Sequence, residues 1–240
     1  LLPTSMDMID VENIIIEVEW KNIKNIHLTV YPPDARVHIS APKSMSIHAV
    51  KLFAIDKLGW IKSKIKLVSD RPRQSKREYV SGENHYFKGV RYRLNVVVHN
   101  SQPKVELKGT QFINLYVKEN ASVEKKKDVI NQWYRNELRK LLPELISKWE
   151  GKLNVKADSW DIKQMKTKWG SCNIKTKKIL FNLELIKKPV HCIEYVVVHE
   201  LSHLIERLHN DKFTSILDNN LPNWRTIKEE LNNFIASEYE

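Results

Sequence analysis

The stretch Tyr195-Val196-Val197-Val198-His199-Glu200-Leu201-Ser202-His203-Leu204-Ile205-Glu206-Arg207-Leu208-His209 contains the pattern His-Glu-x-x-His inside an apolar segment. On a helix, His199 and His203 are four residues apart and therefore lie on one face, about one turn apart. This spacing allows two imidazoles to bind one Zn²⁺. Glu200 can then act as general base toward an attacking water. Because burying these polar side chains is costly unless they bind something, the sequence predicts a zinc site here.

The third ligand is harder to assign, because a catalytic zinc usually has three protein ligands and one open position. His209 lies six residues after His203. A continuous helix would carry it about 9 Å along the axis and roughly 120° around it. His209 can bind the same metal only if the helix ends between Leu204 and Leu208, a segment without glycine. A carboxylate of Glu229 or Glu230 is the alternative third ligand.

Composition and charge limit the class of protein. The chain has 240 residues, of which 42% are hydrophobic and 29% charged, as in ordinary globular proteins. No apolar run approaches the roughly 20 residues needed to cross a bilayer, and the first residues lack the pattern of a secretory signal. Only two cysteines are present, Cys172 and Cys192. We therefore expect a cytoplasmic protein without membrane contact. Nothing in the composition indicates an oligomeric state.

The net charge of +11 favours an anionic partner, for which nucleic acid is the obvious candidate. Basic residues are densest between Lys57 and Arg77, where only Asp70 offsets them. A solvated helix face explains this segment slightly better than a strip of phosphate contacts. Nucleic-acid binding through a basic surface therefore stays a hypothesis.

The hydrophobic pattern predicts an α+β protein with an N-terminal β-rich domain, residues 7–120, and a C-terminal domain, residues 121–240. The N-terminal part contains one predicted helix, which Ser44 or Ser46 can cap and which runs to about Val68, with Gly59-Trp60 as a point of possible interruption. A long helix is expected from Ser122, with a kink or interruption at Pro143. Further predicted elements are strands at 13–19, 25–31, 36–40, within 78–100, 105–107, 112–117, 159–165 and 178–183, and helices from Pro189, at 211–218 and at 225–239.

The chain resembles the YgjP-like metallopeptidase family, which is related to SprT-like proteases and minigluzincins. The resemblance covers nearly the whole chain from about residue 10. It is carried by Trp169-Gly170-Ser171-Cys172, Asn182, Pro189, the segment 195–204, and His209-Asn210-Asp211-Lys212-Phe213. In this family a third histidine follows the His-Glu-x-x-His pattern after five residues. The resemblance therefore implies a zincin-like domain with His199, His203 and His209 as zinc ligands and Glu200 as base. Asn210 replaces the family's usual serine, a departure that touches no ligand.

The resemblance also implies a polypeptide substrate held along an edge strand that runs from Lys168 to Cys172, with Trp169, Gly170 and Ser171 as the substrate-contacting residues. Glycine at 170 would permit close backbone approach, whereas Trp169 could equally belong to the core. Cys172 is expected to be an inert thiol. Tyr195 and Arg207 are weak candidates for stabilising the transition state. The partners of the ligand histidines remain open among Glu206, Asp211 and Glu184.

Three functions compete. The first is a zinc metalloendopeptidase. The second is a protease that acts on proteins bound or crosslinked to DNA. The third is a zinc-stabilised nucleic-acid-binding module without enzymatic activity. Glu200 discriminates between the first and the third, because a structural zinc site needs no base and usually fills all four positions.

Overall fold

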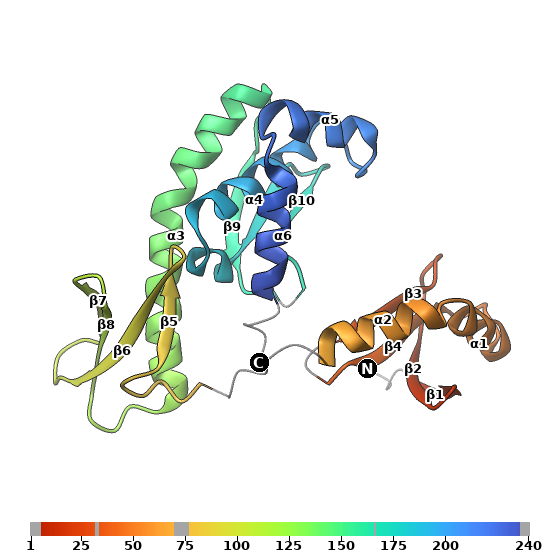
Figure 1. Ribbon diagram of the computed structural model, residues 1–240, viewed down its shortest axis with the longest axis horizontal. Helices are drawn as coiled ribbons and strands as arrows, with labels where there is room; N and C mark the ends of the chain where they lie inside the picture. Colours follow the sequence, from red (N-terminus) through yellow and green to blue (C-terminus); the bar gives the residue numbers. More distant parts are fainter. Residues whose placement is uncertain (1–5, 32–33, 70–76, 166, 236–240) are drawn as a thin grey trace. The chain divides into compact units, whose positions relative to one another are not determined.

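The computed structural model describes residues 6–31, 34–69, 77–165 and 167–235, and it has an α+β fold, as expected (Figure 1). The chain forms two compact units that divide near residue 75. This division differs from the expected domains 7–120 and 121–240. It arises because the strands between residues 84 and 117 share one hydrophobic core with the long helix of residues 123–153. Leu94, Ile113 and Leu115 of these strands are buried in the same core as Ile130 and Tyr134 of the helix.

The first unit is a four-stranded sheet with two helices. The order is β1-β2-β4-β3, in which β2 and β4 are parallel and the other pairs antiparallel. The elements are β1 (Met6–Val11), β2 (Ile14–Lys21), β3 (His27–Tyr31), β4 (Arg36–Pro42), α1 (Ile47–Asp56) and α2 (Leu58–Ser69). Alternating residues of the sheet, including Ile16, Val18 and Ile39, are buried with Val50 and Ile61 of the helices.

The helix expected in this unit is divided into two helices, and the break lies at Lys57 and not at Gly59-Trp60. Ser46 caps α1 and accepts a hydrogen bond from the Ala49 N–H at 3.2 Å. The first helix ends at Asp56, Lys57 is its C-cap with an N–H that donates to the Phe53 carbonyl at 3.1 Å, and α2 begins at Leu58. The basic segment is therefore only partly helical, and its residues 70–76 lie outside the described ranges.

The second unit contains two small sheets and one long helix. Its elements are β5 (Asn84–Phe87), β6 (Val90–Val98), β7 (Lys104–Lys108), β8 (Phe112–Val117), α3 (Val123–Leu153), β9 (Ser159–Lys163), β10 (Gly170–Asn173), β11 (Lys178–Asn182), the 3₁₀ helix η1 (Leu183–Lys187), α4 (Val190–Ser202), α5 (Asp211–Asn220) and α6 (Trp224–Ile235). The sheet orders are β5-β6-β8-β7 and β10-β11-β9. Figure 1 shows α3 running from the first of these sheets toward the second.

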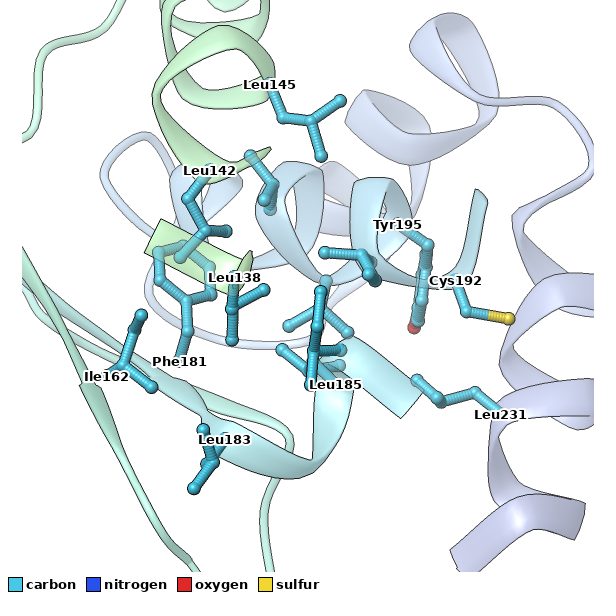
Figure 2. Packing of buried hydrophobic residues seen from close by; sticks show 14 of the residues in the cluster. Leu138, Leu142, Leu145, Ile162, Phe181, Leu183, Leu185, Cys192, Tyr195 and Leu231 are labelled. Atoms are coloured by element: carbon cyan, nitrogen blue, oxygen red, sulfur yellow. The ribbon is translucent and has the colours of Figure 1, made fainter. Parts of the chain in front are cut away.

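The core of this unit is continuous along α3. Figure 2 shows Leu138 and Leu142 of α3 packed with Phe181, Leu185 and Tyr195 from the strand, the 3₁₀ helix and α4. Pro143 lies inside α3 without ending it, contrary to the expected interruption. Proline inside a helix costs about 3 kcal/mol, whereas burying one leucine contributes about 1.5–3 kcal/mol. The leucines buried on both sides of Pro143 therefore keep the helix continuous.

His85 of β5 is buried in the same core, with Nδ1 3.5 Å from the Tyr134 hydroxyl. Burial lowers the pKa of His85 to about 3, and the positive charges of Arg77 and Lys187 act in the same direction. The unfolded chain binds a proton at His85 below about pH 6.5, whereas the folded chain does not until about pH 3. The free energy of unfolding therefore keeps its full value, as far as His85 is concerned, above about pH 6.5 and decreases as the pH falls from 6.5 toward 3.

We predict that His85→Gln flattens this pH dependence. In the wild type the His85 contribution should reduce the free energy of unfolding by about 2 kcal/mol between pH 7 and pH 5. The variant should lose correspondingly less over the same interval. Denaturant unfolding at pH 5, 6 and 7 measures the difference, and parallel curves for the two proteins would contradict the prediction.

Candidate metal centre

The two histidines of the pattern lie on the last turn of α4. The helix starts after Pro189 and buries Val196, Val197 and Val198 in the core, which fixes its orientation. His199 and His203 then project from one face, with ring centroids 5.0 Å apart. The two histidines therefore lie on one face of α4, as their spacing in the sequence predicts.

The helix ends at the second histidine of this pair, early enough for the chain to bring His209 back. Ser202 is the last helical residue, and His203 is the C-cap. The following N–H groups of Leu204 and Ile205 donate to carbonyls only three residues back, both at 3.0 Å, which tightens the turn. None of the described residues from 204 to 208 has a positive φ. The chain thus turns back without a glycine and without a left-handed residue.

Glu206 organises this turn through two different groups. Its carboxylate Oε1 accepts a hydrogen bond from the Leu208 N–H at 3.2 Å. Its backbone carbonyl lies 3.2 Å from Nδ1 of His203. Because a carbonyl only accepts, Nδ1 carries the proton and Nε2 keeps its lone pair for another partner. Glu206 is thus the partner of His203 among the three acidic candidates, since Glu184 pairs with Lys187 and Asp211 starts α5.

Asn210 explains how His209 is held. Its side chain caps α5 and accepts a hydrogen bond from the Phe213 N–H at 3.0 Å. Serine and asparagine are both favoured caps, so this position tolerates either residue. The cap places His209 immediately before the helix and Phe213 in its first turn. Phe213 is buried against all three imidazoles, with ring centroids 4.7–5.0 Å away.

One ring nitrogen from each of His199, His203 and His209 lies within 4.8 Å of the others. The Nε2 atoms of His199 and His209 are 3.0 Å apart. Two nitrogens on a tetrahedral zinc with bonds of roughly 2.0–2.1 Å would be about 3.3 Å apart, so only small adjustments are needed. Three imidazoles with an open fourth position are a known ligand set of catalytic zinc. The residues present therefore fit a zinc ion.

Protonation also favours metal binding. Burial lowers the pKa of His199 to about 3, with a further contribution from His203, His209 and Lys228. Burial likewise lowers the pKa of His203, although its hydrogen bond to Glu206 opposes the shift. Both imidazoles are therefore neutral near pH 7. Neutral imidazole is the form that binds a metal, so no proton has to be displaced from these two rings.

The alternative third ligands lie elsewhere. Glu230 of α6 accepts a hydrogen bond from Nε2 of His191 at 2.7 Å, in a separate group with Cys192 at the start of α4. Glu229 is exposed on α6 and belongs to neither of the two metal-compatible clusters found among the described residues. The geometry thus brings His209, and not a carboxylate of α6, to His199 and His203.

Glu200 is buried beside the histidines, with 5% of its surface exposed. Burial raises the pKa of Glu200 to about 8, while the positive charge of Lys168 opposes the shift. A divalent cation on the adjacent imidazoles would lower this pKa again, because opposite charge favours the ionised form. Burial and the metal charge thus shift the pKa of Glu200 in opposite directions.

Gly170 makes room for this carboxylate. A Cβ atom added at Gly170 would lie 2.6 Å from Oε1 of Glu200 and 2.7 Å from its Cγ. Gly170 is the first residue of β10, which is an edge strand in the described sheet. Any larger residue at 170 must therefore displace either the strand or the base.

We predict that Gly170→Ala lowers the rate of substrate hydrolysis by about 10- to 100-fold while zinc content stays unchanged, because small misplacements of a catalytic group have effects of this size. The matched control is Gly151→Ala on α3, where an added Cβ meets no atom within 4 Å. This control should keep full activity. Equal activity of Gly170→Ala and the wild type would show that Glu200 has no need of the space.

A cleft of about 510 Å³ opens in front of the histidines. Trp169, Gly170 and Ser171 line it, so the structure places all three expected substrate-contacting residues at the site. Trp169 also packs against the core. The Asn182 side chain donates hydrogen bonds to the carbonyls of Met165 and Lys168, both at 2.8 Å. These two residues precede β10 in the sequence, so Asn182 helps to position the start of that strand.

The remaining sequence candidates also lie in the cleft. The Tyr195 hydroxyl is 3.5 Å from Nδ1 of His199, and burial raises its pKa to about 12. Arg207 lines the cleft in the turn between His203 and His209. Cys172 is half-buried, and burial raises its pKa to about 11, which suits an inert thiol. Lys168, at the start of the expected strand, also lines the cleft, whereas Ile174 and three residues of α6 that line it were not predicted from the sequence: Lys228, Leu231 and Asn232.

None of the helices in the described ranges has the length and hydrophobicity of a membrane span.

A model of the YgjP-like family, described as a metallopeptidase domain, matches residues 24–234. No protein with curated annotation matches the chain. Similar solved structures include the metallopeptidase zymogens abylysin from Pyrococcus abyssi and jannalysin from Methanocaldococcus jannaschii. Abylysin is 17% identical, with a TM-score of 0.35 and coverage of 37% of this chain and 90% of abylysin. Jannalysin is 23% identical, with a TM-score of 0.36 and coverage of 39% and 95%, respectively.

Proposed function

The chain belongs to the YgjP-like metallopeptidase family, and from this premise we propose that it is a zinc-dependent endopeptidase. His199, His203 and His209 would hold the ion, and Glu200 would be the general base. The observation that supports this proposal most strongly is the convergence of three imidazoles beside a buried carboxylate at one cleft. The described cluster offers three ligands, which leaves a fourth position for chemistry, whereas structural zinc sites usually fill all four.

When bound, the zinc ion would activate a water molecule and polarise the peptide carbonyl. Glu200 would take the proton from the attacking water and later give it to the leaving amine. Its burial raises the pKa of the carboxylate, and Gly170 leaves it the space to reach the substrate. The edge strand β10 would hold an extended peptide by backbone pairing along Gly170 and Ser171.

The experiment that tests the proposal is digestion of an unstructured protein by the zinc-loaded full chain. We expect internal cleavage that a chelator abolishes and added zinc restores. The contradicting result is an intact substrate at full zinc occupancy, with and without nucleic acid present. That result would leave a zinc-stabilised binding module as the better account.

A second candidate function keeps this chemistry but directs it to proteins on nucleic acid. It is favoured by the net charge of +11 and by Lys57, Lys62 and Lys66, which are exposed on or beside α2. Two of these charges are partly neutralised, Lys57 by Asp56 at 2.8 Å and Lys62 by Glu12 at 2.7 Å. If the surface contacts phosphates, DNA binding should weaken steeply between about 50 and 200 mM salt. Absence of binding at about 50 mM salt would remove this candidate.

A further inference from the structure

The charged side chains that line the cleft are mainly positive. Lys168, Arg207 and Lys228 are cationic, and Glu200 at the back is the single carboxylate among the described lining residues. We propose that the cleft selects polypeptides with acidic side chains close to the scissile bond. This inference rests on the proposed endopeptidase function and adds a substrate class to it.

The three cations come from different parts of the fold and line the same cleft as the histidines. Lys168 lies two residues before the edge strand β10, Arg207 lies in the turn between His203 and His209, and Lys228 belongs to α6. All three are exposed at the cleft. Lys168 acts electrostatically on the pKa of Glu200, and Lys228 on that of His199, so both charges are felt at the catalytic residues. A substrate on β10 would therefore meet positive charge on several sides.

These charges are available to a ligand. Among the described residues, neither Lys168 nor Arg207 nor Lys228 forms an ion pair with a carboxylate; Lys228 lies 5.5 Å above the Trp224 ring. Other cations near the site are already paired, as in Lys212 with Glu206 at 3.7 Å and Arg225 with Asp218 at 2.5 Å. Glu200 cannot neutralise three cations, and a divalent metal would add further positive charge. The cleft is thus left with an excess of positive charge.

The rest of the lining favours a polypeptide over a nucleic acid. Trp169, Ile174 and Leu231 supply apolar surface between the cations. A cleft of about 510 Å³ fits a few side chains, within the usual range for ligand sites. Backbone pairing with β10 is independent of sequence, so the cations would provide the selectivity. An acidic peptide matches the apolar surface, the edge strand and the positive charge together.

The test compares two sets of fluorogenic peptides that differ only by Asp or Ala at one position within three residues of the scissile bond. For the zinc-loaded wild type we expect kcat/KM to be about tenfold higher for the best Asp peptide, since each exposed ion pair contributes up to about fivefold. The preference should shrink at about 0.5 M salt, because exposed charges are screened. Equal kcat/KM for every Asp and Ala pair would overturn the proposal.

Charge variants locate the effect. Lys228→Glu and Arg207→Glu should each reduce the Asp-to-Ala ratio several-fold, and Lys228→Gln should give an intermediate ratio without introducing a new charge. The matched control is Lys127→Glu, an exposed position of α3 outside the cleft, which changes the net charge equally and should leave the ratio unchanged. A ratio that is unaffected in both cleft variants, or reduced equally in the control, would contradict the assignment.

Binding separates this inference from the proposed function. Labelled Asp and Ala peptides are titrated against the zinc-loaded Glu200→Gln protein, in which binding is measured without cleavage. About tenfold tighter binding of the Asp peptide supports the inference even if the wild type cleaves nothing, in which case only the proposed function fails. Equal binding refutes the inference. Displacement of the Asp peptide by a single-stranded oligonucleotide at much lower concentration than by unlabelled peptide would identify the cleft as a nucleic-acid site and would also refute it.

Discussion

Replacement of Glu200 by glutamine is expected to lower kcat/KM for peptide hydrolysis by about 10²- to 10⁴-fold, the usual contribution of a general base. The amide has nearly the same shape as the carboxylate but cannot accept the proton of the attacking water. Because the three imidazoles are unchanged, zinc content should equal that of the wild type. Steady-state kinetics and metal analysis of the same samples measure both quantities.

Two further results would give this prediction its meaning. Glu230→Gln removes a carboxylate of α6 that bonds His191 outside the cleft, and it should keep wild-type kinetics. Full activity of Glu200→Gln would show that another group takes the proton. Loss of zinc from Glu200→Gln would show that the carboxylate supports the metal site and would remove the base assignment.

Removal of the third imidazole in His209→Ala should weaken zinc binding by more than about 100-fold, since even outer partners of metal ligands are worth 10- to 100-fold. The structure gives the reason. His209 is the residue that the turn after α4 and the Asn210 cap bring within 3.0 Å of His199. Competition with a chromophoric chelator measures the affinity of both proteins.

The matched comparison is Glu230→Ala, the alternative ligand that the sequence left open. We expect it to bind zinc as the wild type does, because Glu230 lies with His191 and Cys192. Zinc loss in Glu230→Ala with retention in His209→Ala would reverse the ligand assignment. Asn210→Ala should fall between the wild type and His209→Ala, because it removes the cap but not the ligand.

Local sequence features predicted the parts of the site that depend on helix geometry. The spacing of His199 and His203 was enough to place them on one face, and the structure has them there. The helix end was required for His209 but had no sequence signal such as glycine. It is produced by backbone hydrogen bonds from Leu204 and Ile205 to carbonyls three residues earlier, and by the hydrogen bond from the Leu208 N–H to the Glu206 carboxylate. Such hydrogen bonds depend on the three-dimensional path of the turn, so the sequence alone does not predict them.

Contacts between distant segments were not predictable in the same way. Lys228 and Leu231 reach the cleft from α6, and no local pattern connects that helix to β10 or α4. The need for glycine at 170 depends on a carboxylate 30 residues later in the chain. The division near residue 75 was not predicted because the strands β5 to β8 follow those of the first unit in the sequence and have a similar pattern. Their buried residues nevertheless pack on α3. The family resemblance was confirmed over residues 24–234, and the α+β fold was confirmed as well.

If one zinc ion held by three histidines makes this chain a peptidase, activity must follow zinc occupancy. Metal-free protein is titrated with zinc, and the initial rate of peptide hydrolysis is measured at each step. We expect a rate that rises linearly and stops rising at one equivalent of zinc per chain. Hydrolysis that is independent of zinc, or absent at every zinc concentration, would contradict it.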